Sequence, residues 1–184
     1  MRAKVALVAA LAILLLPGLV FAQDERKDFQ VFQDVAKAVT TYTRFTVFDD
    51  VEGSVDHGVV TLTGKVTMPY QATDIEKRVA KVAGVRQVRN EITVLPVSFF
   101  DDDLRYDIAR SIYGNPAFWH YAAMANPPIH IVVENGRVTL TGVVNNNVER
   151  VLARSLATRF GAFSVDNQLK TDAEMQALLE KMDD

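Results

Sequence analysis

Histidine is the residue type in this chain best suited to metal binding or proton transfer, and it occurs three times, as His57, His120 and His130. A metal site needs several ligands that converge on one point. No two of the three histidines have the HxH or HxxxH spacing that brings such ligands together. His57 lies in a turn-like DHG sequence, and His130 alternates with isoleucines, which places it on the polar side of a strand. The sequence therefore predicts no metal site.

The other residue types that could do chemistry are also isolated. The chain has no cysteine, which excludes disulfides and thiolate nucleophiles. None of the serines lies in a GxSxG or SxxK setting. The three aspartates at 101–103 begin a predicted helix, where acidic residues complement the helix dipole. No phosphate-binding glycine loop is found, and the sequence predicts neither an enzyme nor a cofactor.

An aromatic segment, NPAFWHYAAMANPP, occupies residues 115–128. Its large apolar residues are Phe118, Trp119, Tyr121 and Met124, and Trp119 is the only tryptophan. Two interpretations are open: burial in the core or between domains, or an exposed patch for a bilayer or a partner. Small domains are short of core, which favours burial. If the protein has a lipid or partner surface, we predict that it lies at these four residues.

Basic residues are the second candidate surface. They are Lys77, Arg78, Lys81, Arg86 and Arg89, followed later in the chain by Arg150, Arg154 and Arg159. A solvated helix face is the usual explanation for such a group. An anionic headgroup surface is the alternative, because each basic residue near a membrane is worth about 1 kcal/mol.

The elements that must position these residues follow from hydrophobic periodicity. Helical spacing predicts helices at 28–42, 73–85, 101–114, 146–161 and 172–182. Alternation and turn signals predict extended segments at 46–55, 59–66, 85–94, 127–136, 137–144 and 163–170. The elements therefore appear in the order α-β-β-α-β, twice.

An internal repeat supports this order. The sequence DHGVVTLTGKV at 56–66 returns as ENGRVTLTGVV at 134–144, and later matches follow, such as Asn90 with Asn167. Each VTLTG is expected to be the inner strand of its sheet. The repeat also carries glycines with expected structural roles, namely Gly58, Gly64, Gly84, Gly136, Gly142 and Gly161.

Gly64 and Gly142 interrupt the alternation of their strands, which marks a bulge or a close backbone approach, here from the neighbouring helix. Replacing either glycine with valine is expected to lower the melting temperature. Gly84 stands where a C-terminal helix cap is expected.

These motifs resemble the BON-domain family, in particular tandem BON-domain secreted proteins similar to osmotically induced periplasmic proteins. The resemblance rests on GVVTLTGKV with VAGVRQVRNEI in the first copy, and on PPIHIVVENGRVTLTGVV in the second. It implies a non-catalytic envelope protein associated with phospholipid or envelope binding and with stress tolerance. The chain lacks the lipid-anchor cysteine of related lipoproteins and adds the aromatic segment and a C-terminal helix.

The N-terminus has the pattern of a secretory signal peptide. A basic start is followed by the apolar run VALVAALAILLL and by VFA at 20–22, which predicts cleavage near Ala22. An uncleaved anchor helix is the alternative, but the apolar stretch is short for a bilayer and contains Pro17 and Gly18. Removing Arg2 and Lys4 takes the formal net charge from −3 to −5. A negative charge disfavours nucleic acid as a partner.

The predicted fold class is α+β, with two tandem α-β-β-α-β modules, each a three-stranded sheet packed by two helices on one face. The expected organisation is a signal peptide (1–22), a first module (23–95), a linker (96–100), a second module (101–171) and a C-terminal helix (172–184). The expected function is a non-enzymatic periplasmic or secreted envelope protein that contacts an anionic phospholipid surface. The alternative is a structural protein–protein module that docks to an envelope protein. Small-solute binding between the modules is a weaker third possibility, because no convergent polar set is visible.

Overall fold

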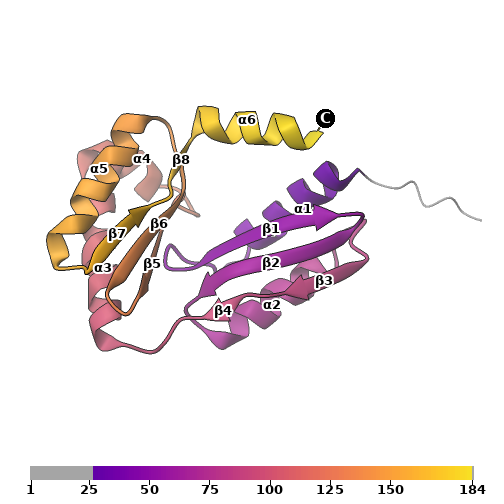
Figure 1. Ribbon diagram of the computed structural model, residues 1–184, viewed down its shortest axis with the longest axis horizontal. Helices are drawn as coiled ribbons and strands as arrows, with labels where there is room; N and C mark the ends of the chain where they lie inside the picture. Colours follow the sequence, from indigo (N-terminus) through magenta and orange to yellow (C-terminus); the bar gives the residue numbers. More distant parts are fainter. Residues whose placement is uncertain (1–26, 184) are drawn as a thin grey trace, which may run out of the picture.

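The computed structural model describes residues 27–183, arranged as two modules side by side and a final helix (Figure 1). The predicted signal peptide and its cleavage site lie outside the described residues. Module 1 consists of α1 (Asp28–Thr40), β1 (Asp50–Asp56), β2 (Val59–Val66), α2 (Pro69–Val79), β3 (Gln87–Asn90) and β4 (Thr93–Val94). Module 2 consists of α3 (Phe99–Tyr113), the 3-10 helix η1 (Pro116–Phe118), α4 (Trp119–Ala122), β5 (Ile129–Glu134), β6 (Arg137–Val144), α5 (Asn147–Ala157), the 3-10 helix η2 (Thr158–Phe160), β7 (Ser164–Asn167) and β8 (Lys170–Thr171). Helix α6 (Asp172–Asp183) follows.

The two sheets have the same topology. In each, a central strand pairs antiparallel with the strand before it and parallel with the strand that follows the second helix. The central strands are β2 and β6, which carry the two copies of VTLTG. The last strand is interrupted in both modules, so β3 and β4 pair with successive parts of β2, as β7 and β8 do with β6. The predicted fold class and the repeat are confirmed.

The register of the hairpins is also repeated. Gly64 faces Val51 across β1 and β2, and Gly142 faces Ile129 across β5 and β6. Both glycines have positive φ, at 115° and 104°. A β-carbon on Gly64 would lie 2.2 Å from the Asp50 carbonyl oxygen, and one on Gly142 would lie 1.8 Å from the Pro128 carbonyl oxygen. The close approach therefore comes from the backbone at the start of the preceding strand, from Asp50 in β1 and from Pro128 just before β5, and the expected approach by a helix was wrong.

Each module has its own apolar core between its helices and one face of its sheet. In module 1 the core residues are Val31, Val35, Val39, Tyr42, Val60, Leu62, Val66, Ile75 and Val79. In module 2 they include Leu104, Ile108, Ile112, Phe118, Tyr121, Ile129, Ile131, Leu140 and Leu156. The inward residues alternate along β2 and β6, as strand geometry requires.

Module 1 covers part of the second sheet. The Ile131 N–H at the outer edge of β5 donates to the Val47 carbonyl at 2.7 Å. The Phe45 ring lies 5.3 Å from the His130 ring, and the Phe48 ring lies 5.1 Å from the Tyr106 ring. Lys65 on β2 forms an ion pair with Glu134 on β5. The outer edge of β5 and the part of its outward face around His130 are therefore a contact between the modules.

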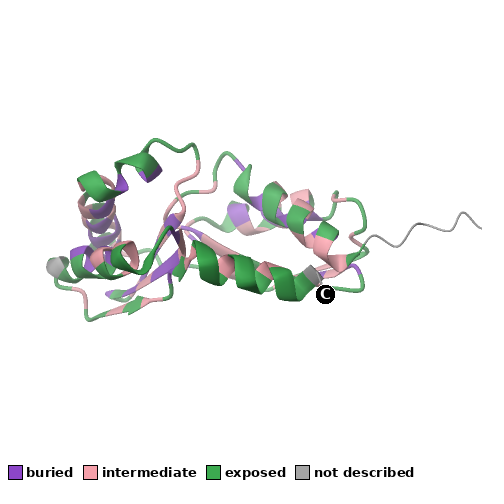
Figure 2. Cartoon of the chain, turned by 90° about the horizontal axis from the view of Figure 1, so that it is seen from above, coloured by how far each residue is buried: buried purple, intermediate pink, exposed green. Residues whose placement is uncertain are grey.

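Helix α6 leaves module 2 and runs beside module 1, above α1 and β1 in Figure 1. It is exposed along most of its length, as the green colouring in Figure 2 shows. The Arg150 guanidinium holds its first turn by donating to both Glu174 oxygens, at 3.0 and 2.9 Å. Among the described residues, no helix combines the length and apolar character that crossing a bilayer requires.

Candidate functional surfaces

The predicted aromatic surface is divided by the fold. Phe118 is 0% exposed and Tyr121 is 4% exposed, and both belong to the core of module 2. The Tyr121 hydroxyl donates to Glu149 at 2.7 Å and accepts the Asn145 N–H at 2.8 Å, and burial raises the pKa of Tyr121 to about 12. These two residues cannot contact a membrane or partner, because the short helices η1 and α4 turn them inward. For these two residues the favoured interpretation, burial in the core, describes the structure, and they leave the candidate surface.

Trp119 and Met124 remain exposed. Trp119 is 61% exposed, and its indole N–H donates to the Gly114 carbonyl at 3.2 Å. The bond fixes the ring at the C-terminal end of α3. The surface predicted at four residues is thus reduced to two.

A further aromatic surface, which was not predicted from the sequence, lies at the other end of α3. Phe99 and Phe163 are 88% and 81% exposed, and Phe100 is 55% exposed. A β-carbon on Gly136 would lie 2.6 Å from the Phe163 ring and 3.3 Å from the Phe100 ring, so both rings flank the turn between β5 and β6. We call Phe99, Phe100 and Phe163 the phenylalanine patch.

Local sequence explains why these rings point outward. Ser98 caps α3 by accepting the Asp101 N–H at 3.2 Å, so the helix begins at Phe99 and its first turn projects beyond the sheet. Phe163 follows η2 and begins the return toward β7. A hollow of about 440 Å³ next to the patch is lined by Phe163, Glu134, Asn135 and Arg137.

The predicted basic residues do not form one surface. Arg78 is used inside module 1, where Nε donates to the Ala38 carbonyl at 3.0 Å and the guanidinium lies over the Tyr42 ring. Arg150 is bound to Glu174 of α6. The exposed basic side chains are Lys77, Lys81, Arg86, Arg89 and Arg154. They are divided between the two modules, whose helices α2 and α5 lie far apart (Figure 1), and the side chain of Arg159 lies outside the described ones.

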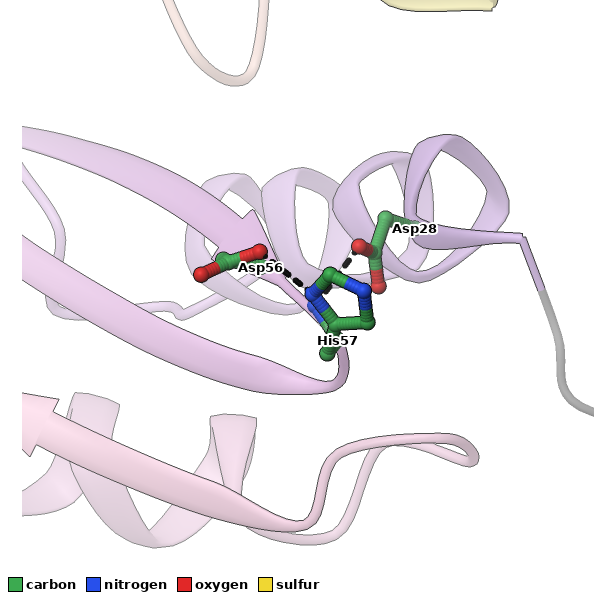
Figure 3. Close-up of side chains that lie close together, drawn as sticks. All are labelled: Asp28, Asp56 and His57. Carbon is green, nitrogen blue, oxygen red and sulfur yellow. Dashed lines mark hydrogen bonds and ion pairs between the residues drawn. The ribbon is translucent and has the colours of Figure 1, made fainter.

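One group of possible metal ligands occurs in the described part of the chain, at Asp28, Asp56 and His57 (Figure 3). The Asp28 carboxylate accepts the backbone N–H of His57 at 2.7 Å and that of Gly58 at 3.0 Å. The His57 Nδ1 atom is 2.6 Å from Asp56 Oδ1. Both Asp28 oxygens are therefore already bound to the turn of the hairpin.

Module 2 contains the same arrangement around another turn. The Asp101 carboxylate accepts the N–H of Asn135 at 2.8 Å and that of Gly136 at 2.7 Å. His57 and Asn135 are the two non-glycine residues with positive φ in the described chain, each in the position before a positive-φ glycine. Because module 2 builds the same clamp without histidine, the cluster at Asp28 is explained as a structural support of the turn.

His130 points to the side of the strand that the sequence predicted, but it is largely buried there. It lies on the outward face of β5 beside Thr141, and module 1 covers that part of the face. Within residues 27–183, neither His130 Nδ1 nor Thr141 Oγ1 has a hydrogen-bond partner. Burial lowers the pKa of His130, and the nearby Asp50 carboxylate opposes that shift. The third histidine, His120, is exposed and lies with Nε2 3.2 Å from the Asn145 amide nitrogen.

Comparison with known proteins gives one family. The model of the BON domain matches residues 30–96 and 119–173. No curated protein matches the sequence. The chain thus has a family match on both copies of the repeat.

Solved structures give weaker similarities. One is the C-terminal domain of CdsD, described as the structural protein of the type III secretion system of Chlamydia trachomatis, with 17% identity and a TM-score of 0.32. The match covers 77% of this chain and 65%, just under two thirds, of that one. A second CdsD structure has 15% identity and a TM-score of 0.29, with 82% of this chain and 97% of that one covered. TM-scores this low carry no argument about function.

Proposed function

Because the chain belongs to the BON-domain family, whose members are envelope-associated and generally non-enzymatic, we propose that it is a non-catalytic envelope protein that binds phospholipid surfaces through the phenylalanine patch. The observation that carries this proposal is the exposure of three phenylalanines at one end of module 2. The rings of Phe100 and Phe163 flank the same turn, and Phe99 precedes Phe100 in the first turn of α3. Monomeric proteins rarely leave contiguous apolar rings in water unless a membrane or partner covers them.

The chemistry of the patch suits a bilayer interface. Burying one phenylalanine side chain contributes about 1.5–3 kcal/mol, so three rings are enough for reversible attachment. Arg137 and Glu134 beside the patch have opposite charges. We therefore expect apolar insertion, rather than attraction to anionic headgroups, to drive binding. The expected dependence on salt is weak, because apolar burial is not screened.

Vesicle flotation tests this proposal. The full chain should float with phosphatidylcholine vesicles, and adding anionic lipid should increase binding only slightly. Replacing all three patch residues with serine should reduce binding at least about tenfold, since each lost ring removes more than 1 kcal/mol. Serine at these exposed positions should leave the melting temperature nearly unchanged.

A matched control lies at the opposite end of α3. The double variant Trp119→Ala and Met124→Ala removes exposed apolar area from α4 and the segment after it, while leaving the phenylalanine patch intact. It should float like the parent protein. If this variant loses binding and the serine variant does not, the site is the surface that the sequence predicted. If neither chain binds vesicles, the alternative function, docking to an envelope protein, replaces the lipid proposal.

We propose further that the protein is exported, is cleaved near Ala22 and supports envelope integrity under osmotic stress. The apolar N-terminal pattern and the family support these statements. N-terminal sequencing of the mature protein tests the cleavage. Survival of a deletion strain under osmotic shock, complemented with the parent gene or with the serine variant, tests the role in stress.

A further inference from the structure

A groove runs beside β1 of module 1, and its lining shows its direction. Every residue from Asp50 to Val55 contributes to it. Successive side chains of a strand point to opposite faces of the sheet. A groove that contacts six consecutive strand residues must therefore run along the edge of the sheet, not over one face. Among the described strands, β1 pairs with β2 alone, which makes it an edge strand.

The register shows which backbone groups point into the groove. The turn at His57 and Gly58 joins Asp56 to Val59, and these residues form the hydrogen-bonded pair that closes a two-residue hairpin. Bonded and non-bonded pairs alternate along an antiparallel ladder. The N–H and C=O groups of Val51, Gly53 and Val55 consequently point away from β2, into the groove. Within residues 27–183, no other element forms a hydrogen bond with these groups.

Module 2 shows what such an edge can bind. Ile131 on β5 occupies the position of Gly53 on β1, because each faces the leucine of VTLTG. Its outward N–H donates to the Val47 carbonyl at 2.7 Å. The chain thus already uses extended backbone to cover the outer edge of its second sheet. The equivalent edge of the first sheet has no such cover within the described residues.

The walls of the groove are apolar on both sides. Helix α1 contributes Phe32, Val35, Ala36 and Val39, and helix α6 contributes Met175, Leu178, Leu179 and Met182. The volume is about 740 Å³. An extended chain along β1 would place every second side chain against these walls and the others on the opposite face of the sheet.

The acidic residues on that opposite face favour basic residues at the remaining positions of the bound chain. Even-numbered positions of β1 point away from the core of module 1, and three of them are acidic: Asp50, Glu52 and Asp56. Lys170 and Lys181 also line the groove, from β8 and α6, so a basic side chain of an occupant gains only where it lies closer to Asp50 or Glu52 than to these lysines. A second copy of this chain is a poor occupant, because pairing β1 with β1 would place these acidic residues opposite one another, and like charges across a ladder destabilise it.

We propose that the groove binds an extended peptide with alternating apolar and basic residues, which adds to the edge of β1 as a new strand. The apolar side chains of the peptide fill the space between α1 and α6, and its basic side chains pair with Asp50 and Glu52, which line the groove. This goes beyond lipid attachment and uses a different surface, so the two proposals can fail separately.

Fluorescence anisotropy with the full chain tests the proposal. The probe is a labelled heptapeptide of alternating lysine and valine, and the control peptide has glutamate in place of lysine. Glu52→Lys should weaken binding of the lysine peptide at least about threefold and strengthen binding of the glutamate peptide, since one cross-strand charge pair is reversed. Glu52 is exposed, so the variant should fold normally. The matched control, Glu91→Lys, places the same charge change on an exposed residue outside the groove and should bind like the parent chain.

Hydrogen exchange measured by NMR distinguishes strand addition from other binding. The lysine peptide should slow exchange of the amides of Val51, Gly53 and Val55, and a variant with serine at all three phenylalanine-patch positions should show the same protection. The proposal is overturned if the peptide binds without protecting these amides, or if Glu52→Lys and Glu91→Lys behave alike. It is also overturned if the three amides are already protected in a concentration-dependent dimer, which would make a second copy the occupant.

Discussion

A carboxylate at the start of the first helix of each module fixes the turn of the following hairpin. Asp28 and Asp101 each accept two backbone N–H groups from residues that have positive φ. Asp101 is fully buried, whereas Asp28 is partly exposed. These hydrogen bonds should therefore contribute more to the free energy of unfolding in module 2, because loss of the carboxylate would leave buried N–H donors without an acceptor.

Asp101→Ala is expected to lower the free energy of unfolding by about 3 kcal/mol, since two hydrogen bonds to a charged group are lost. Asp28→Ala should lower the free energy of unfolding by less, because water can bind the N–H groups of the turn at His57 and Gly58 in place of the lost carboxylate. Urea denaturation measures both. The control is Asp103→Ala, an exposed acid in the same helix turn as Asp101, which should change stability little. Equal effects of the three variants would refute the clamp.

Glycine at 64 and 142 is expected to be required for stability. Gly64→Ala or Gly142→Ala should each lower the free energy of unfolding by at least about 2 kcal/mol, since positive φ and a clash with a carbonyl oxygen act together. Gly53→Ala is the matched control in β1, because its β-carbon would lie at an ordinary 3.7 Å from Leu62. Thermal melting compares the three. Loss of vesicle or peptide binding with an unchanged melting temperature would instead make Gly64 or Gly142 a binding residue.

At the scale of elements, the segment between α1 and β1 is held by one buried side chain. The Asp49 carboxylate accepts the N–H and hydroxyl of Thr46, the N–H and hydroxyl of Thr67, and the Gln71 amide, at 2.7 to 2.9 Å. It is 0% exposed. This carboxylate therefore fixes the position of Val47, which covers β5.

Asp49→Ala should lower the free energy of unfolding by about 3 kcal/mol or more, because several buried donors lose a charged acceptor. It should also loosen the contact between the modules, which hydrogen exchange at the Ile131 amide would detect. Glu52→Ala, an exposed acid on the adjoining strand, is the control and should leave that amide protected. A protected Ile131 amide in the Asp49 variant would show that Val47 is positioned by other contacts.

The elements could be predicted from the sequence where the hydrophobic period was regular. VTLTG predicted the central strands, and the aspartates at 101–103 predicted a helix start there. The helix α3 begins two residues earlier, at Phe99, because Ser98 is its N-cap. The second helix was expected at 73–85 but forms at Pro69–Val79. Its start was missed because Pro69 was not recognised as a first-turn residue, a position that proline favours. Gly84 therefore lies beyond the helix end rather than at its cap.

At the scale of the whole molecule, stability should depend on pH through His130, which is largely buried where the two modules meet. It faces Phe45, with Asp49 and Asp50 nearby. Its pKa is lowered by burial, so the unfolded chain takes up a proton more readily than the folded one. The contribution of His130 to the free energy of unfolding is therefore fully present above the ordinary histidine pKa of about 6.5. It is lost as the pH falls below that value, toward the lower pKa of His130 in the folded chain.

Urea unfolding at about pH 7.5 and about pH 5.5, which bracket that ordinary pKa, checks this expectation. The parent chain should be less stable at the lower pH. His130→Phe should remove most of the difference, because the aromatic ring is kept and the titrating group is lost. His120→Asn, which removes an exposed histidine, should keep the pH dependence of the parent. The same pH dependence in all three proteins would exclude His130 as its source.

The candidate surfaces were harder to predict than the fold, for a physical reason. Periodicity shows which residues of an element share a face, but not what covers that face. Phe118 and Trp119 are adjacent, yet one is buried and the other exposed. Phe99 and Phe100 stood in a segment interpreted as a linker, and only the fold brings Phe163 beside Phe100. The two adjacent phenylalanines at the start of a helix were the signal that could have been used.

The bond between Val47 and Ile131 also has a consequence for the order of folding. Domains generally fold as units, with the N-terminal one completed first during synthesis. The segment that holds Val47 belongs to module 1 and is fixed there by Asp49, so it exists before β5 has formed. We therefore expect the Val47 carbonyl to be in place when β5 forms. The edge of β5 would then be covered soon after it forms, which shortens the period in which another chain could pair with it and aggregate. The second sheet would thus form after module 1 and against a surface of module 1 that is already folded.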